Sequence, residues 1–305
     1  MKLRLAKPTE ERVIYNLWKE IFAFDDGGYT DFYFQTLYPS AKTYVLTDEQ
    51  DELVSCLNVH SKVLVFNQER FRASFIVGIL TVPKHQHKGY MHQLLDGVLE
   101  ILSATELFTL IQGYKDLAYV PFGFEDAYFR RQFIIDQNAI PVMSATGVSF
   151  HEDPLAMSHL YQQFTQHFNG TPLRSSEDFK ILIEEVKSQK GRIISYASDN
   201  ALKAYAMIYP HTSHIDIDEI IYTDTKSLLT LLSALGNSNP HLLLKVSQAE
   251  DLSRLLPTCP MELKAYTALR INDLALFNQH FKLNVKNTKE ALYAFKAPFW
   301  IRENA

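Results

Sequence analysis

The sequence has few of the residues that build covalent or metal-based frameworks. Among its 305 residues are two cysteines, Cys56 and Cys259, which lie far apart and outside any C-x-x-C arrangement. Two such thiols cannot form a disulfide framework or a thiolate zinc site within one chain. Glycine and proline are also scarce, with 11 and 12 residues, and no biased or short-period tract is present. Collagen-like, low-complexity and disordered proteins are therefore excluded.

Long apolar runs and an excess of basic residues are missing as well. No stretch approaches the roughly 18 apolar residues that a membrane-spanning helix needs, and the start MKLRLAKPTEERV lacks the apolar core of a signal peptide. We therefore expect a cytoplasmic protein with no membrane partner. The 30 Lys and Arg against 35 Asp and Glu give a net charge of −5. This balance argues against a general nucleic-acid binder, whose affinity would come from a basic face.

Motifs of metal and serine catalysis are also absent. His85, His87 and His92 lie close together, as do His211 and His214, but neither set has H-E-x-x-H or a comparable ligand register. We therefore expect no metal site. Without a G-x-S-x-G segment, a serine nucleophile of the hydrolase type has no support either.

The remaining composition is that of an ordinary globular protein, with 47% hydrophobic and 12% aromatic residues. At roughly 150 residues per domain, the length predicts about two domains. In the first half, period-2 and period-3.6 patterns predict the order β-α-α-β-β-β-α-β-α-β, with an antiparallel meander over 42–82 and an amphipathic helix over 88–102. The second half partly repeats this order, with helices near 153–168, 176–187 and 227–235 and strands at 192–197, 204–208, 214–222, 242–246 and 264–270.

Domain boundaries follow from where these patterns fade. The segment 137–149 loses periodicity and contains Pro141 and Gly147, so we place the boundary near residue 140. The expected division is a first domain over 1–140, a second over 141–285, and a short aromatic C-terminal tail over 286–305. Both domains are expected to be α/β layers.

The segment from Gly78 to His92 carries the most chemical information. A strand ends at Val82-Pro83, a polar basic loop follows, and an amphipathic helix begins near Lys88-Gly89. A glycine in such a turn lets the backbone approach a ligand closely, and the first N–H groups of a helix point outwards at its positive dipole end. The pattern is a candidate cradle for pyrophosphate, although an ordinary strand-to-helix turn would look the same.

Two spaced motifs favour the cradle. Pro83-x-x-Gln86-x-x-Gly89-x-Met91 resembles the pyrophosphate loop Q/R-x-x-G-x-G/A of the GNAT acetyltransferases, with Met91 in place of the usual small residue. About 30 residues later, Tyr119-Val-Pro-Phe-Gly-Phe124 resembles the family's second element, Y-x-x-x-G-F/Y. The order of elements is also that of a GNAT domain. A tandem GNAT-like half and the segment L-R-I-N-D at 269–273 are further similar to the enhanced-intracellular-survival (Eis) acetyltransferases, without a complete C-terminal domain of the sterol-carrier type.

The resemblance implies a fold and a cofactor. The fold would be α/β (α+β), with two GNAT-like domains, each a mixed, mostly antiparallel sheet flanked by helices. Acetyl-CoA would be the co-substrate. The backbone of Ile79, Leu80 and Thr81 would pair with its pantetheine arm as an added strand. The pyrophosphate would take its donors, chiefly backbone N–H groups, from Gln86, His87, Lys88, Gly89, Tyr90 and Met91.

The resemblance also implies a reaction, direct transfer of acetyl to an amine. Tyr119 would act as the general acid that protonates the leaving thiolate. Asp25 and Asp26 are candidates for binding a cationic acceptor, and Asp116 for a base. The acceptor, an aminoglycoside, polyamine, lysine side chain or peptide, stays open. A homo-oligomer is also implied. The alternative is a catalytically degenerate GNAT pair that binds a ligand or protein partner, which Met91 and the missing base favour.

Overall fold

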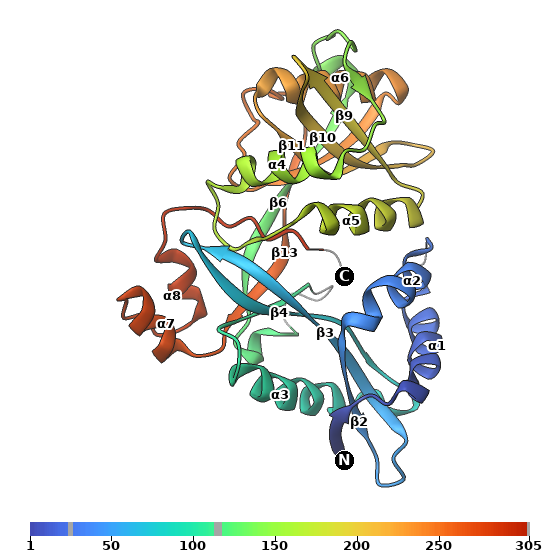
Figure 1. Ribbon diagram of the computed structural model, residues 1–305, viewed down its shortest axis with the longest axis vertical. Coiled ribbons are helices and arrows are strands. Elements are labelled where there is room, and N and C mark those ends of the chain that lie inside the picture. The colour runs from blue at the N-terminus through green and yellow to red at the C-terminus, as the bar shows by residue number, and fades with distance from the viewer. Residues whose placement is uncertain (24–26, 113–117, 304–305) are drawn as a thin grey trace. The chain divides into compact units, whose positions relative to one another are not determined.

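The computed structural model of the chain describes residues 1–23, 27–112 and 118–303, and within them two compact units. Unit 1 consists of Met1–Ala127, Asn169–Pro172 and Tyr266–Ala305, and unit 2 of Tyr128–Phe168 and Leu173–Ala265. In each unit, helices cover a mixed, mostly antiparallel sheet (Figure 1). The fold class predicted from the sequence is therefore confirmed.

The sheet of unit 1 begins with an antiparallel meander. Its strands lie in the order β1 (Lys2–Leu5), β2 (Lys42–Thr47), β3 (Leu53–Phe66) and β4 (Glu69–Thr81), and each pairs antiparallel with the next. β3 and β4 are long enough to pair along most of their length across the tight turn at Asn67-Gln68, where both residues have positive φ. The antiparallel meander predicted over 42–82 is confirmed.

A parallel strand follows β4 through a helical crossover, as parallel pairing requires. The helix α3 (Tyr90–Ser103) connects β4 to β5 (Phe108–Ile111), which pairs parallel with the middle of β4. Apolar residues of α3 recur at helical spacing and bury one stripe against the sheet. That stripe consists of Leu94, Leu95, Val98, Leu99 and Leu102.

The opposite face of β3 and β4 is covered by helices from the N-terminal segment (Figure 1). These are α1 (Glu11–Ile21) and α2 (Tyr29–Phe32), and α2 continues into a π-helical turn at Tyr33–Leu37. Trp18 of α1 is buried there, stacked on Tyr33 with ring centroids 4.5 Å apart. Unit 1 thus has α3 on one face of its sheet and an aromatic layer on the other.

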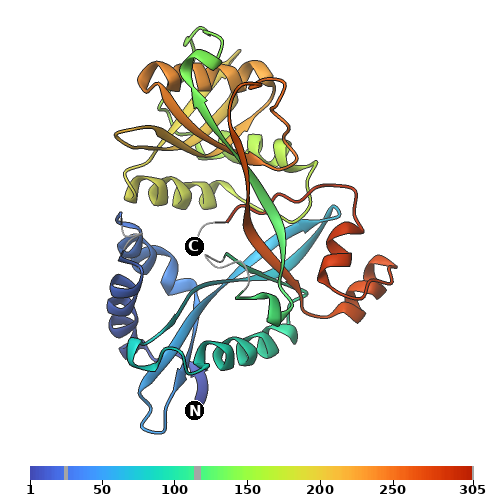
Figure 2. The same ribbon diagram turned by 180° about the vertical axis from the view of Figure 1, so that it is seen from behind.

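Unit 2 repeats the arrangement. Its strands β9 (Arg192–Ser198), β10 (Ala201–Pro210) and β11 (Ile215–Tyr222) form an antiparallel meander, with the short β7 (Val148–Ser149) beside β9. The helix α6 (Thr225–Ser238) then connects β11 to the parallel strand β12 (His241–Ser247). α6 covers one face of this sheet, and α4 (Pro154–Thr165) and α5 (Ser176–Ser188) pack on the other (Figure 2).

The two units exchange their last strands. β5 of unit 1 pairs antiparallel with Ala268–Ile271 of β13 (Met261–Ile271), a strand from the second half of the chain. β12 of unit 2 pairs antiparallel with residues 130–136 of β6 (Glu125–Asp136), a strand from the first half. Each half of the sequence therefore supplies the strand that completes the sheet of the other.

The C-terminal segment joins unit 1, which differs from the expected division into residues 1–140, 141–285 and a tail. After β13 come α7 (Leu274–Phe281) and α8 (Thr288–Tyr293), and Phe299, Trp300 and Ile301 are buried. The short strand β8 (Thr171–Pro172) pairs with β3 and also belongs to unit 1. The aromatic side chains of this segment explain its packing, because they bury large apolar areas against the end of β3 around Phe66.

Candidate functional site

The parallel strands β4 and β5 separate part of the way along β4. They pair from Ala73↔Phe108 to Ile76↔Ile111, and β4 then continues to Thr81. Over Val77–Thr81, β4 pairs with β3 on one side, and within the described residues no strand covers its other edge. Ile79, Leu80 and Thr81, the predicted pantetheine-binding residues, lie on this open edge. An open edge offers backbone groups to an extended ligand.

A bulge in β4 coincides with the point of separation. Asn58 of β3 pairs with Val77, but Cys56 pairs with Leu80, so Gly78 and Ile79 together face one residue of β3. Such a bulge bends a strand and increases its twist. Gly78 has φ +58°, and a Cβ there would lie 1.9 Å from Cζ2 of Trp18. Only glycine fits between the bulge and the aromatic layer.

The loop after β4 leads into an uncapped helix. Gly89 is the N-cap of α3 with φ +79°, and a Cβ at this position would meet nothing within 4 Å. A side chain at the N-cap normally accepts a hydrogen bond from the first turn of the helix. Glycine leaves these donors without that partner and leaves the space in front of them open.

The donors at this helix end form a consecutive set. The backbone N–H groups of residues 87–92 have no acceptor among the described residues, and the first helical bond runs from Gln93 N to Gly89 O. The positive φ of His87, +61°, turns the backbone just before the helix. Successive N–H groups at a helix N-terminus, together with the helix dipole, bind anions such as phosphate. The predicted pyrophosphate cradle therefore has the required donors.

The side chains of residues 86–91, between β4 and the first turn of α3, leave the N–H donors open and mostly contact the loop itself or the core. Gln86 is exposed and its Nε2 donates to Thr81 O at 3.2 Å, which bridges the base of the loop. Lys88 Nζ donates to Lys84 O at 3.1 Å, so its charge stays beside the loop. Met91 packs against the apolar cluster under α3. Tyr90 is half-buried and meets His85 edge to face.

Tyr119 lies on the α3 side of the sheet. It packs against the apolar cluster that includes Phe122 and Phe124, with its ring centroid 6.2 Å from that of Phe124. Burial raises the pKa of Tyr119 above its usual value, which keeps the phenol protonated at neutral pH. Its hydroxyl makes no hydrogen bond to a described residue and is not fully buried. A protonated phenol in this state can serve as a proton donor.

The glycine of the second motif is anchored to the C-terminal part of unit 1. Gly123 has φ +81°, and its carbonyl accepts a hydrogen bond from Thr288 Oγ1 at 3.1 Å. Sequence reasoning did not anticipate this contact, because Thr288 lies in the segment expected to be a tail. Asp25, Asp26 and Asp116, named for acceptor binding or as a base, lie outside the described residues.

The equivalent helix end of unit 2 is closed. Asp224 is the N-cap of α6, and its carboxylate accepts from the N–H of Ser227 at 2.8 Å. Between the ends of β11 and β12, Glu250 accepts from Tyr222 Oη at 2.7 Å and from Ser247 N at 2.9 Å. Burial raises the pKa of Glu250 to about 7. The Asp224 carboxylate thus occupies the end of α6 that corresponds to the open N–H donors of α3 in unit 1.

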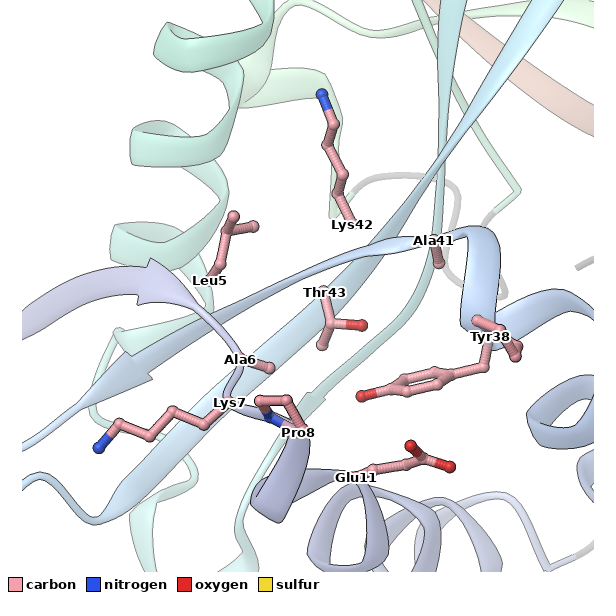
Figure 3. A pocket seen from close by; sticks show the side chains of 10 residues that line it. Leu5, Ala6, Lys7, Pro8, Glu11, Tyr38, Ala41, Lys42 and Thr43 are labelled. Atoms are coloured by element: carbon pink, nitrogen blue, oxygen red, sulfur yellow. The ribbon is translucent and has the colours of Figure 1, made fainter.

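A separate hollow of about 320 Å³ lies where β1 ends and β2 begins, beside the first residue of α1 (Figure 3). It is lined by residues 5–8, Glu11, residues 38–39 and residues 41–43. It contains no residue of the loop before α3 and none of the Tyr119 motif. We assign it no role in the chemistry of the site.

Comparisons with known proteins show which chains and folds this one is similar to. Residues 2–127 match the family model described as acetyltransferase (GNAT) domain. A probable N-acyltransferase of Enterococcus faecalis has a TM-score of 0.77 at 17% identity, over 90% of this chain and 74% of its own. Eis1 from Mycobacterium abscessus has a TM-score of 0.70 at 13% identity, over the same shares. A tandem GNAT protein from the clavulanic acid biosynthesis pathway has 0.56 at 11%, over 89% and 99%.

At these identities the solved structures establish a shared fold, and the predicted likeness to tandem GNAT proteins is confirmed at that level. A comparison with curated protein sequences gave no match. In the described residues, none of the helices is long and apolar enough to cross a membrane.

Proposed function

We propose that the chain transfers an acetyl group from acetyl-CoA to an amine acceptor, since residues 2–127 match the model of the GNAT acetyltransferase domain. The observation that carries the proposal is the uncapped N-terminus of α3 beside the open edge of β4. The first offers N–H donors to a pyrophosphate and the second offers a strand edge to an extended amide chain. Acetyl-CoA contains both groups, because its pantetheine arm is an extended amide chain that carries the pyrophosphate at one end and the thioester at the other.

In this proposal the cofactor binds along one continuous path. Its pyrophosphate accepts from the free N–H groups of His87–Met91, in the loop that begins at Gln86, and its pantetheine pairs with Ile79, Leu80 and Thr81. The thioester then lies where β4 and β5 separate, near Ile76 and Ile111. Gly89 keeps the pyrophosphate position clear because it has no side chain.

The reaction needs one nucleophile and one acid. The neutral amine nitrogen attacks the thioester carbon, a C–N bond forms, and the C–S bond breaks. Tyr119 gives its hydroxyl proton to the leaving thiolate, the amine proton passes to a base or solvent, and the phenolate is reprotonated from solvent. The raised pKa of Tyr119 keeps this proton in place until the thiolate forms.

Unit 2 has a different part in the proposal. With Asp224 at the N-cap of α6, a negative charge occupies the position that an incoming pyrophosphate would need. We therefore assign the cofactor to unit 1 alone. The net charge of −5 also suits a cationic amine as acceptor.

The test is thermal unfolding with and without acetyl-CoA, followed by an amine screen that monitors free CoA. A ligand at 100 times its Kd adds about 2.7 kcal/mol to the stability of the native state. The proposal expects a clear upward shift and acetylation of at least one amine. A shift without acetylation of any amine would favour the second candidate, a catalytically degenerate GNAT pair that binds a ligand or partner. No shift at millimolar acetyl-CoA would refute both the cofactor and the reaction.

A further inference from the structure

A buried tyrosine and a half-buried histidine form an isolated polar pair in the aromatic layer of unit 1. Tyr33 Oη and His60 Nε2 are 2.8 Å apart, and their rings meet edge to face. Tyr33 has 0% of its surface exposed and is the first residue of the π-helical turn after α2. His60 lies on β3 directly opposite Phe75 of β4. Neither residue belongs to the motifs that identify the cofactor site.

The direction of this hydrogen bond fixes the tautomer of His60. A buried hydroxyl must donate its proton, because an unmade bond there is costly. Among the described residues, the hydroxyl of Tyr33 has no other partner than His60 Nε2. Tyr33 is therefore the donor, Nε2 is the acceptor, and the ring proton of a neutral His60 sits on Nδ1.

The imidazole is held neutral by its surroundings. The pKa of His60 is lowered to about 4, chiefly by burial and also by the nearby Lys62, while Glu303 opposes the change. Lys62 and Glu303 form an ion pair at 2.5 Å, so their charges largely compensate each other. At neutral pH, His60 presents an uncharged N–H group.

Nδ1 of His60 is available to a ligand. It has no hydrogen-bond partner among the described residues, and it is not among their fully buried unpartnered polar atoms, so solvent reaches it. One nitrogen of the ring is thus fixed by the protein and the other is free. A ring held in this way is pre-organised to donate one directed hydrogen bond.

His60 lies on the face that the cofactor leaves free. In the proposed function, the pyrophosphate lies at α3 and Tyr119 packs on the α3 side, so the acceptor amine reaches the thioester from the side of α1 and α2 (Figure 1). Val59, the neighbour of His60, pairs with Ile76, the last residue of β4 before the strands separate. β4 therefore lies between His60 and the thioester, and the backbone of β3 that carries His60 is about 5 Å from that of β4. This distance suits a contact with the body of the acceptor rather than with its reacting nitrogen.

We propose that His60, oriented by Tyr33, is a specificity-determining residue that donates its Nδ1–H to an oxygen of the acceptor. The inference rests on the proposed function and names a substrate class for it: amines that carry a carbonyl or hydroxyl oxygen close to the amino group. A protonated diaminoalkane has donors only and cannot accept this bond. It would leave the N–H unpaired, which disfavours it.

The test uses two matched pairs of amines. Lysine amide and 1,5-diaminopentane differ by one carboxamide. Glucosamine differs from cyclohexylamine by its ring oxygen, its hydroxyl groups and one hydroxymethyl group. The wild-type chain should acetylate the oxygen-bearing member of at least one pair with the higher kcat/KM. One lost hydrogen bond to a pre-organised donor is expected to change this preference by roughly ten-fold.

Two variants separate the donor from the packing. In His60→Asn the amide nitrogen is as many bonds from Cβ as Nδ1, so the donor is kept and the Tyr33 contact is lost. In His60→Gln the amide reaches the position of Nε2, so the contact is kept and the donor is lost. His60→Asn should retain most of the preference, and His60→Gln should lose roughly ten-fold of it, mainly through KM. Tyr33→Phe should weaken the preference because it frees the tautomer.

Nitrogen-15 chemical shifts give a readout that needs no turnover, and they should show His60 as the neutral Nδ1–H form at pH 7. The Nε2–H form, or an equal preference in wild type and His60→Gln with unchanged melting temperatures, would overturn the inference and leave the proposed function intact. Acetylation of none of the four amines, with acetyl-CoA bound, would overturn the inference together with the acceptor class.

Discussion

Replacing Gly89 tests whether an anion binds at the N-terminus of α3. Because Gly89 has φ +79°, any other residue is strained there, at about 1 to 2 kcal/mol for alanine and less for aspartate. A Cβ meets nothing within 4 Å, so neither Gly89→Ala nor Gly89→Asp should clash. Both variants should fold and lose roughly 1 kcal/mol of stability. An aspartate carboxylate can recover part of this loss by capping the free N–H groups.

The two variants should differ in cofactor binding. A carboxylate 4 Å from a phosphate charge costs about 1 kcal/mol in bulk water and about 4 kcal/mol at the effective dielectric of a protein surface. The Kd for acetyl-CoA should therefore rise by roughly 5-fold to 1000-fold in Gly89→Asp. In Gly89→Ala only a methyl group enters the space, so most of the affinity should remain.

The assay is calorimetric titration with acetyl-CoA, combined with thermal unfolding of each variant. Added salt should narrow the gap between the two variants, since the difference is electrostatic and this loop is exposed. The reasoning would be refuted if Gly89→Asp bound acetyl-CoA as tightly as Gly89→Ala. The pyrophosphate would then not lie at the N-terminus of α3.

Three further perturbations follow from the structure. Tyr119→Phe should lower kcat by about 10²-fold or more with an unchanged Kd for acetyl-CoA, and equal turnover in the variant and the wild type would remove Tyr119 from the mechanism. Because the phenol must be protonated and its pKa is raised, the activity of the wild type should persist to high pH and fall only above 10. Gly78→Ala should destabilise the chain by about 2 kcal/mol or more in urea unfolding, since its Cβ would lie 1.9 Å from Trp18; a change below about 0.5 kcal/mol would contradict this packing. The pKa of Glu250 in the folded state is raised to about 7, so its contribution to stability is fully present below about pH 4.5 and is lost as pH rises through 7. Glu250→Gln should therefore reduce the change of unfolding free energy over this pH range by on the order of 1 to 3 kcal/mol. Identical stability–pH profiles for the variant and the wild type would show that the carboxyl is not buried as described.

Much of the fold could be predicted because the local patterns agree with the tertiary structure. The helical spacing from Met91 to Leu102 matches the buried stripe of α3, and the strand-like runs over 42–82 match the paired strands of the meander. The start of α3 differs by two residues from the predicted position, because Gly89 adopts a positive φ and serves as the N-cap. The tail could not be predicted to pack, since the burial of Trp300 depends on contacts with segments far away in the sequence.

The cofactor loop and the Tyr33–His60 pair also differ in how far the sequence could predict them. The loop before α3 is a contiguous motif, so its residues and spacing can be found in the sequence. The Tyr33–His60 pair joins residues 27 positions apart through a π-helical turn and a strand register. No periodicity signals such a contact, and each residue alone reads as part of the aromatic core.

The exchange of the last strands has a consequence for synthesis on the ribosome. β5 receives its antiparallel neighbour from residues 268–271, so the sheet of unit 1 stays incomplete until almost all of unit 2 has left the ribosome. At about 5 to 20 residues per second, the roughly 150 intervening residues take on the order of 10 to 30 seconds. During this delay β5 has an exposed edge, and β6 waits in the same way for β12. The nascent chain therefore cannot complete its domains one after the other, and a fragment cut between them would lack one strand in each.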